Sequence, residues 1–209
     1  MTNLFVILGC SSSGKDTITK KMLSDEQFKI FNLKNIVDYT TRPMRIGEVN
    51  SKEHYFDNKD TFKKRIRMGF FAEYRKYRVK AKEKVWYYGT PKYSINKEGN
   101  YVLILDYKGL QQLKKYCKHR SNINIYSLFI YTDPYNRLLR SLEREKAVFK
   151  ELSKKEYELK ISEIIRRYQY DNKTIAKCIN KCNYIIHNTD SIKCTMDEVY
   201  NILSNILLN

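Results

Sequence analysis

The chain has 209 residues, of which 42% are hydrophobic, and this is enough apolar material for one domain with a buried core. Its formal net charge of +17 indicates contact with anions, while its apolar content excludes wholesale disorder. The sequence contains no run of about 18 apolar residues, so we expect no membrane-spanning segment.

Apolar runs of strand length alternate with stretches of helical spacing in the first half of the chain. Strands are predicted at residues 4–8, 35–39, 70–74 and 85–88, with helices at 15–23 and from Asp57 or Asn58 to residue 68. The last two strands flank a polar, lysine-rich connection. Residues 42–98 as a whole show the short-strand pattern of an insertion.

The second half continues this alternation with longer elements. An apolar strand at 101–105 ends in Asp106, which is typical of a buried parallel strand. Further strands are predicted at 125–131 and 184–187, and helices at 110–118, from Asp133-Pro134 onward, at 153–178, and after a capping box at 195–198. The alternation predicts an α/β fold with a parallel sheet flanked by helices.

Residues 9–17 read Gly-Cys-Ser-Ser-Ser-Gly-Lys-Asp-Thr and follow directly on the first predicted strand. This segment is nearly the phosphate-binding loop G-x-x-x-x-G-K-[ST]. The glycines allow a tight turn whose N–H groups point at phosphate oxygens, and the helix that follows favours anions at its N-terminus. We therefore expect an ATP-binding loop in which Lys15 reaches the β and γ phosphates; its members are Gly9, Ser11, Ser12, Ser13, Gly14, Lys15, Asp16 and Thr17.

One position departs from the loop pattern. Asp16 stands where a serine or threonine is expected, and Thr17 comes one residue later. Asp16 is either an acidic residue that suits a helix start or an oxygen ligand of Mg²⁺. We expect Asp16 or Thr17 to help place a magnesium ion.

Further motifs follow in order along the chain. Residues 40–48 read Thr-Thr-Arg-Pro-Met-Arg-Ile-Gly-Glu, and Glu73 and the segment Tyr-Tyr-Gly-Thr-Pro-Lys at 87–92 come next. Residues 105–112 contain a D-x-x-G segment, and Arg140 and Arg144 form R-x-x-x-R. Together with the phosphate loop, these segments resemble the guanylate kinase family over nearly the whole chain.

The resemblance implies a P-loop kinase fold in one domain, with a core at 1–36 and 99–209, an inserted subdomain that binds the nucleoside monophosphate at about 37–98, and a helical lid at about 140–170. It also implies transfer of a phosphoryl group from ATP to a nucleoside monophosphate, with Mg²⁺ as cofactor. GMP or dGMP is the expected acceptor. The alternatives are a kinase for another nucleotide or small molecule, and a binding module without catalysis.

Arg42 and Arg45, three residues apart in a loop, can bind the acceptor phosphate with forked hydrogen bonds. His54 or Tyr55, together with Tyr88, would add hydrogen bonds there. Glu48 either touches the ligand or anchors the loop by binding an arginine. Because phosphoryl transfer needs positioning and charge neutralisation, Arg42 is also a catalytic candidate.

Glu73 is the residue that the resemblance assigns to base recognition, since a carboxylate can accept from both N1–H and the 2-amino group of guanine. Thr90 and Asp106 would assist, near the base or the phosphate loop. The family usually has a serine, a donor to guanine O6, two positions before the T-T-R segment. Here that position is Asp38, which leaves the base preference open, including recognition of the 6-amino group of adenine.

The lid candidates are Arg140, Arg144 and one of Arg166 and Arg167, of which we choose Arg167. In the resembling enzymes such arginines close over the phosphates. Arg140 and Arg144 also have the spacing of a solvated charged helix face. Asn188, after the last predicted strand, is expected near adenine.

Five cysteines, an odd number, fit free thiols better than a disulfide framework. Cys178, Cys182 and Cys194 lack the close pairs and nearby histidines of a zinc site, so we interpret them as buried or incidental. The apolar run near Met1 leaves no room for a signal peptide, which predicts a cytoplasmic protein. Despite the positive charge we expect no specific nucleic-acid partner, and the sequence does not indicate an oligomeric state.

Overall fold

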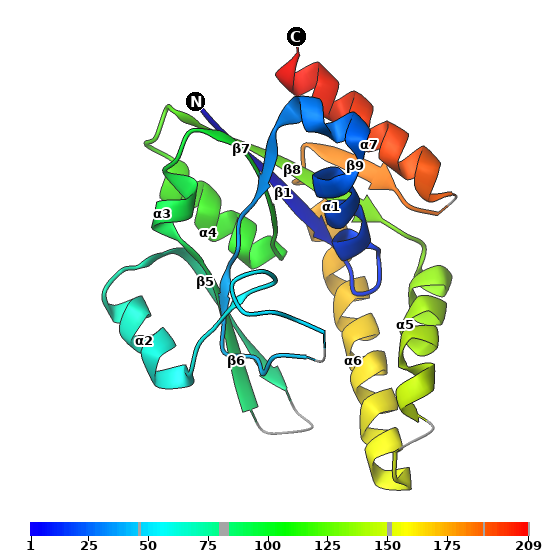
Figure 1. The fold of residues 1–209 in the computed structure, drawn as a ribbon. Coiled ribbons are helices and arrows are strands. Elements are labelled where there is room, and N and C mark those ends of the chain that lie inside the picture. Colours follow the sequence, from blue (N-terminus) through cyan, green and yellow to red (C-terminus); the bar gives the residue numbers. More distant parts are fainter. Residues whose placement is uncertain (46, 80–83, 150–151, 190, 209) are drawn as a thin grey trace. The chain divides into compact units, whose positions relative to one another are not determined.

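A computed structural model describes residues 1–45, 47–79, 84–149, 152–189 and 191–208 (Figure 1). The strands are β1 (Thr2–Gly9), β2 (Leu33–Asn35), β3 (Tyr39–Thr40), β4 (Tyr55–Phe56), β5 (Phe71–Val79), β6 (Lys84–Pro91), β7 (Gly99–Ile104), β8 (Ile123–Tyr131) and β9 (Tyr184–His187). The helices are α1 (Lys15–Ser24), the 3₁₀ helix η1 (Glu26–Phe31), α2 (Lys59–Arg67), α3 (Lys92–Ile95), α4 (Tyr107–Cys117), α5 (Pro134–Phe149), α6 (Lys154–Ile179) and α7 (Ile192–Leu207).

The chain divides into two compact units. The first unit consists of Met1–Val6 and Asn32–Tyr126, and the second unit consists of Ile7–Phe31 and Ser127–Asn209. The five-stranded sheet has the order β2-β7-β1-β8-β9, and a four-stranded sheet has the order β4-β3-β6-β5. The division falls within β1 and β8, so each unit contains a part of both strands.

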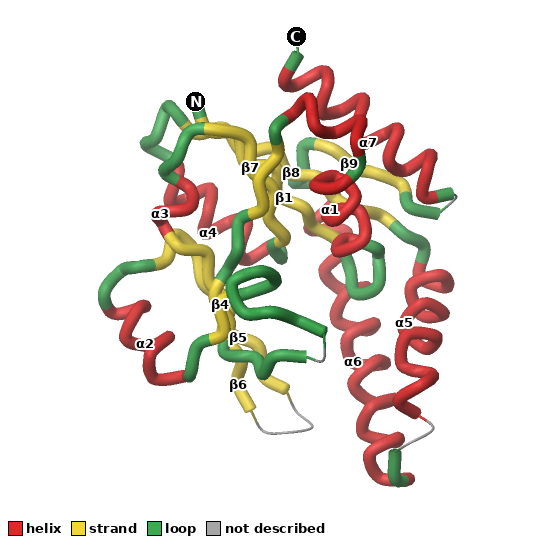
Figure 2. Tube along the Cα trace, in the orientation of Figure 1, coloured by secondary structure: helices red, strands yellow, loops and turns green. Residues whose placement is uncertain are grey.

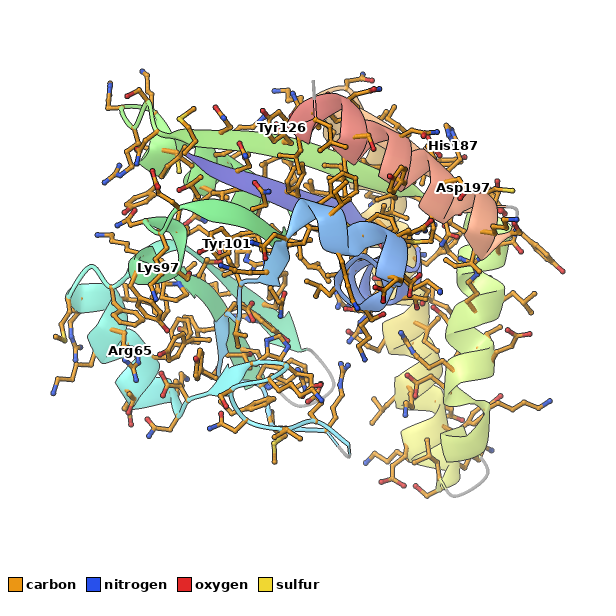
Figure 3. All side chains as sticks on the ribbon, turned by 45° about the horizontal axis from the view of Figure 1, so that its top comes forward. Arg65, Lys97, Tyr101, Tyr126, His187 and Asp197 are labelled. Carbon is orange, nitrogen blue, oxygen red and sulfur yellow. The ribbon has the colours of Figure 1, made fainter. Side chains whose placement is uncertain are left out.

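In the first unit, β2 pairs with β7 in parallel, and the long hairpin of β5 and β6 forms one side of the smaller sheet, with β5 at the edge (Figure 2). The core of this smaller sheet is aromatic. Phe62 of α2 stacks on Phe71 with ring centroids 4.5 Å apart, and Tyr39 stacks on Tyr55 at 4.7 Å. The Arg65 guanidinium, labelled in Figure 3, lies 4.7 Å from the centre of the Tyr39 ring. These contacts hold α2 and the short strands β3 and β4 against the hairpin.

In the second unit, β8 pairs with β9 in parallel. Helices α1 and α7 pack on each other and on η1, where the Tyr200 ring meets Phe28 and Phe31 at centroid distances of 5.8 and 5.2 Å. Helices α5 and α6 run alongside each other (Figure 1). Asp133 caps the start of α5 by accepting from the backbone N–H of Asn136.

The predicted α/β class with parallel strand pairing is confirmed, and so are most elements in the predicted order. The long helix predicted at 153–178 is α6, which begins with a capping box between Ser153 and Glu156. Strands β5 and β6 are longer than predicted. The polar connection predicted at residues 75–84 is therefore wrong for residues 75–79 and 84, which belong to the strands, while residues 80–83 lie outside the described residues.

Two predicted elements are wrong. The single strand expected at 35–39 is two short strands in different sheets, because β2 ends at Asn35 and β3 begins at Tyr39. The last helix does not begin after a capping box at 195–198. It begins at Ile192, where the Ser191 hydroxyl accepts from the backbone N–H of Cys194. The short helices η1 and α3 were not predicted.

In the part of the chain that the structure describes, no helix combines the length and the hydrophobicity that a bilayer crossing requires. All five cysteines are free thiols: Cys10, Cys117 and Cys178 are buried, Cys182 is half-buried, and Cys194 is exposed.

Candidate functional site

The loop between β1 and α1 has the backbone of a phosphate-binding loop. Gly9 has φ +151° and Gly14 has φ +91°. Residues other than glycine rarely adopt such positive φ angles. Space is limiting as well, since a Cβ on Gly9 would lie 2.7 Å from the Ile130 carbonyl oxygen and one on Gly14 would lie 2.4 Å from Nδ2 of Asn188. Both positions therefore require glycine.

Neutral side chains hold this loop from the ends of β8 and β9. The Ser13 carbonyl accepts from the Thr132 hydroxyl at 3.1 Å and from the Asn188 side-chain amide at 2.8 Å. The Thr195 hydroxyl in turn lies 3.2 Å from Oδ1 of Asn188. Asn188, expected near adenine, is buried and uses its amide to anchor the loop.

Lys15 is the first residue of α1, and its ammonium group bends back over the loop. Nζ donates to the carbonyls of Gly9 at 2.9 Å and Cys10 at 2.6 Å. Burial lowers the pKa of Lys15, against the opposing effect of Asp16. Asp16 and Thr17 are exposed in the first turn of α1.

Helices α5 and α6 line a small pocket of about 80 Å³ in the second unit. Cationic and polar residues one or two turns apart on each helix face it: Arg137, Ser141 and Arg144 from α5, and Lys160, Glu163 and Arg167 from α6. Glu163 accepts from Nε of both Arg166 and Arg167, at 2.7 and 2.9 Å. Glu145 and Asp171 also line the pocket, so its four cationic side chains lie beside three carboxylates.

The four predicted lid arginines occupy different positions. Arg144 and Arg167 line the pocket, and Arg144 is largely exposed beside Glu145. Arg140 lies next to the phosphate loop, with Nη2 3.3 Å from the Asn188 carbonyl. Arg166 pairs with Glu163 and is not among the pocket-lining residues named above.

Sequence reasoning missed Arg137 and Asp171. Arg137 is 2% exposed, and its Nη2 donates to Asn172 at 2.8 Å while its Nη1 lies 3.6 Å from Asp171. The Asp171 carboxylate also accepts from the backbone N–H of Ser11 in the phosphate loop at 2.6 Å. Spacing offered a signal, because Arg137, Ser141 and Arg144 follow the i, i+4, i+7 pattern of one helix face.

In the first unit, the T-T-R segment is organised by a buried ion pair. The Arg42 guanidinium is 4% exposed and forms two hydrogen bonds with the Glu48 carboxylate, at 2.8 and 2.9 Å. Glu48 also accepts from the backbone N–H of Arg45 at 2.8 Å. The hydrogen bonds from Arg42 lower the pKa of Glu48 to about 2. Glu48 thus anchors the loop, as one of the two predicted alternatives has it, and the side chain of Arg45 is exposed.

Glu73 is almost completely buried in β5. The Thr90 hydroxyl donates to its Oε1 at 2.7 Å, and Nε of Arg75 lies 2.9 Å from its Oε2. Burial raises the pKa of Glu73, and the charge of Arg75 opposes this shift. Arg75, which sequence reasoning missed as a site residue, also lies 3.6 Å from the Asp38 carboxylate.

Of the other predicted substrate residues, Asp38 and Tyr88 lie beside Arg75. Asp38 forms a short contact with Nδ1 of His54. The Tyr88 ring meets the His54 ring at a centroid distance of 6.0 Å, while the Tyr55 ring stacks on Tyr39. Asp106 caps α4 by accepting from the N–H of Gly109 at 2.8 Å.

Gly109 of the D-x-x-G segment allows α4 to approach the buried pair closely. A Cβ there would lie 3.1 Å from Oε2 of Glu73 and 3.0 Å from Cδ of Arg75. Asp106 also accepts from the Tyr77 hydroxyl at 2.5 Å. The D-x-x-G segment thus packs closely against Glu73 and Arg75 and keeps both side chains in place.

The sequence model of the family described as guanylate kinase matches residues 1–202. The chain belongs to the guanylate kinase family. It is 31% identical over 191 residues to the guanylate kinase of Caldanaerobacter subterraneus subsp. tengcongensis, covering 90% of this chain and 80% of that relative. A match to the guanylate kinase of Porphyromonas gingivalis is 34% identical over 126 residues, covering 58% of this chain and 62% of that relative, which is less than two thirds of its length.

A solved structure shares the fold of this member of the guanylate kinase family. The crystal structure of guanylate kinase from Anaplasma phagocytophilum aligns with a TM-score of 0.67 at 21% identity, covering 99% of this chain and 87% of that one. The predicted P-loop kinase architecture, a mostly parallel sheet flanked by helices, is thereby confirmed.

Proposed function

We propose that this protein transfers the γ-phosphoryl group of ATP to GMP or dGMP and releases ADP and the nucleoside diphosphate. The observation that carries the proposal is a phosphate loop that keeps both glycines and the lysine, in a chain of the guanylate kinase family. The buried Glu73 carboxylate is available to accept from the base. The reaction needs no general base, because the acceptor phosphate is already ionised at neutral pH.

In the proposed mechanism the loop from Gly9 to Lys15 binds the phosphates of ATP through backbone N–H groups. Lys15 neutralises negative charge at the β and γ phosphates, and burial strengthens this electrostatic interaction. The exposed carboxylate of Asp16 and hydroxyl of Thr17 are hard oxygen donors in the first turn of α1, and they fit Mg²⁺ bound partly by protein and partly by phosphate. When bound, the ion would offset charge on the phosphate oxygens.

Arg42 and Arg45 bind the acceptor phosphate in this proposal. Glu48 fixes the Arg42 guanidinium and the backbone of Arg45, so part of the ordering is complete before the ligand arrives. The lid at residues 140–170 supplies three further arginines that bind the transferred phosphoryl group, namely Arg140, Arg144 and Arg167. Arg137 lines the same pocket as Arg144 and Arg167. Arginines in such roles contribute about 10³–10⁵ to the rate of other phosphoryl-transfer enzymes.

The domain organisation that goes with this mechanism has residues 37–98 as the part that binds the monophosphate and residues 1–36 and 99–209 as the core. We place the reaction in the cytoplasm, which supplies ATP and keeps free thiols reduced.

A coupled assay of ADP release tests the proposal with Mg-ATP and a panel of GMP, dGMP, AMP, CMP, UMP and dTMP. We expect turnover with GMP or dGMP, and a loss of it in Lys15→Ala. Lys20→Ala, on an exposed position of the same helix, is the matched control and keeps the activity. Turnover of another acceptor alone would overturn the base assignment, and no turnover with any acceptor would favour a binding module.

A further inference from the structure

The buried pair of Glu73 and Arg75 has unused hydrogen-bonding capacity. Nη2 of Arg75 donates to Oε1 of Glu73 at 3.4 Å, whereas Nε of Arg75 and Oε2 of Glu73 form an ion pair at 2.9 Å and make no hydrogen bond with any other described residue. Glu73 is 1% exposed and Arg75 is 9% exposed. Because each of these two buried atoms has only the other as a partner, a ligand that offers a complementary acceptor and donor would add a hydrogen bond to each.

We infer that Arg75 is a specificity-determining residue that donates to O6 of the guanine base while Glu73 accepts from N1–H and the 2-amino group. This inference rests on the proposed function. It assigns to Arg75 the donor role that the serine of related proteins plays and that the Asp38 carboxylate cannot play.

Asp38 supports Arg75. Its carboxylate contacts His54 on one side and lies 3.6 Å from Nη2 of Arg75 on the other. Burial alone would lower the pKa of Arg75, but the nearby carboxylate of Glu73, together with Tyr77, Asp106 and Asp38, raises it above the usual value. Arg75 therefore remains a charged donor at every physiological pH.

The order of donors and acceptors matches guanine. Its Watson–Crick edge presents an acceptor at O6 and donors at N1 and N2, and the site offers a guanidinium donor beside a carboxylate with two acceptor oxygens. Adenine presents a donor at its 6-position and an acceptor at N1, so it can satisfy at most one carboxylate oxygen and one donor. Arginine is also the residue that most often reads guanine O6 and N7 in nucleic acids.

The strand geometry keeps the two side chains together. Glu73, Arg75 and Tyr77 occupy alternate positions of β5 and therefore face the same side of the hairpin, toward α4. The Tyr77 hydroxyl is held by Asp106, and the absence of a side chain at Gly109 leaves room for Arg75. A side chain in this position can shift by the small distance that a base requires while its backbone stays in the sheet.

The test compares substrate atoms with variants. Equilibrium affinities are measured for GMP, for 6-thio-GMP, whose sulfur is a weaker acceptor than O6, and for IMP, which lacks the 2-amino group. The variants are Arg75→Met, Arg75→Lys, and Arg78→Met as a matched control that removes an exposed arginine from the same strand. We expect wild-type protein and Arg78→Met to prefer GMP over 6-thio-GMP by roughly 10–100-fold.

In Arg75→Met that preference falls to near unity, while the preference for GMP over IMP, which reports on Glu73, is retained. Arg75→Lys recovers part of the first preference. If Arg75→Met weakens GMP and 6-thio-GMP equally, the residue is only structural and the inference fails.

The design separates this inference from the proposed function and from misfolding. Binding ratios are measured without turnover, so an enzyme that binds guanine but does not phosphorylate it would refute the proposed function alone. If Arg75→Met does not fold, the double variant Asp38→Ser with Arg75→Ala removes the unpaired charge and restores a hydroxyl donor. A second double variant, Asp38→Asn with Arg75→Ala, serves as its control. We expect the variant that carries Asp38→Ser to prefer GMP over 6-thio-GMP and the control to lack this preference. Equal affinity ratios for GMP and 6-thio-GMP in the two double variants would contradict the inference.

Discussion

The two units of the molecule hold their candidate binding groups in different ways. In the second unit, the Ser13 carbonyl of the phosphate loop is held by two neutral groups, the hydroxyl of Thr132 and the amide of Asn188, while the Asp171 carboxylate and the Lys15 ammonium bind other backbone groups of the loop. In the first unit, the candidate binding groups are held by buried ion pairs, Arg42 with Glu48 and Glu73 with Arg75.

Under the proposed function, the difference follows from the ligand chemistry of each unit. Backbone N–H groups bind phosphate oxygens well, and any sequence provides them if the turn points these groups toward the ligand. Reading a base and fixing a monophosphate require charged side chains, and these must be neutralised when they are buried. We therefore expect the second unit to be sensitive to backbone shape and the first unit to be sensitive to charge.

The largest expected effect tests backbone shape. Gly14→Ala places a Cβ 2.4 Å from Asn188 at φ +91°, whereas Gly47→Ala in the first unit has φ +84° but meets nothing within 4 Å. Both variants carry backbone strain of about 1–2 kcal/mol. Only Gly14→Ala also displaces the loop, and we expect its kcat/KM to fall by about 100-fold or more. Equal losses of kcat/KM in the two variants would remove the distinction between the units.

A second prediction concerns charge in the first unit. Glu48→Met leaves the Arg42 guanidinium buried and unpaired, and we expect it to lower the free energy of unfolding by about 2–3 kcal/mol. Arg42→Met with Glu48→Met removes both charges and should recover part of this loss. Chemical denaturation measures both values. A double variant no more stable than Glu48→Met would show that packing, and not the unpaired charge, sets the cost.

The same pair predicts a pH dependence of stability. The pKa of Glu48 is about 2 in the folded protein, against 4.5 for the free side chain, so its ion pair stabilises the fold fully above pH 4.5. This contribution disappears as the pH falls from about 4.5 through about 2. The difference in unfolding free energy between wild-type protein and Glu48→Gln should shrink over that window. A difference that stays constant down to pH 2 would contradict the assigned pKa.

The smallest effect is expected at a thiol in the phosphate loop. Burial raises the pKa of Cys10 to about 11, so at pH 8 only about one molecule in a thousand carries the thiolate. Iodoacetamide should therefore modify the exposed Cys194 well before Cys10, as peptide mass spectrometry can measure. Early modification of Cys10 would mean that the loop opens readily in solution.

The sequence was most informative where the backbone determines the structure. The phosphate loop could be predicted because glycine spacing and a following lysine are local properties of the chain. The start of α7 could not, since Ser191 and Thr195 both have the side chain of an N-cap. The structure shows that the Thr195 hydroxyl instead contacts Asn188, a residue seven positions away that becomes a neighbour only in the folded chain.

The buried charges were harder to predict for the same reason. Arg75 lies in a stretch of β5 with several basic residues, and the strand predicted at 70–74 ended before it. Once β5 is known to continue to Val79, the alternation of side chains places Arg75 on the face of Glu73 and Arg78 on the opposite face. The anchoring role of Glu48 was among the predicted alternatives, because its partner Arg42 is only six residues away.

The hairpin also limits how this binding site can change over evolution. A bulge lies between Phe71 and Glu73 in the pairing with β6, and beyond it the residues of β5 pair without interruption up to Val79. Insertion or deletion of one residue near this bulge would turn Glu73, Arg75 and Tyr77 together to the opposite face of the sheet. Descendants of this chain can therefore exchange these side chains one at a time, but a change in strand length would erase all three contributions in a single step.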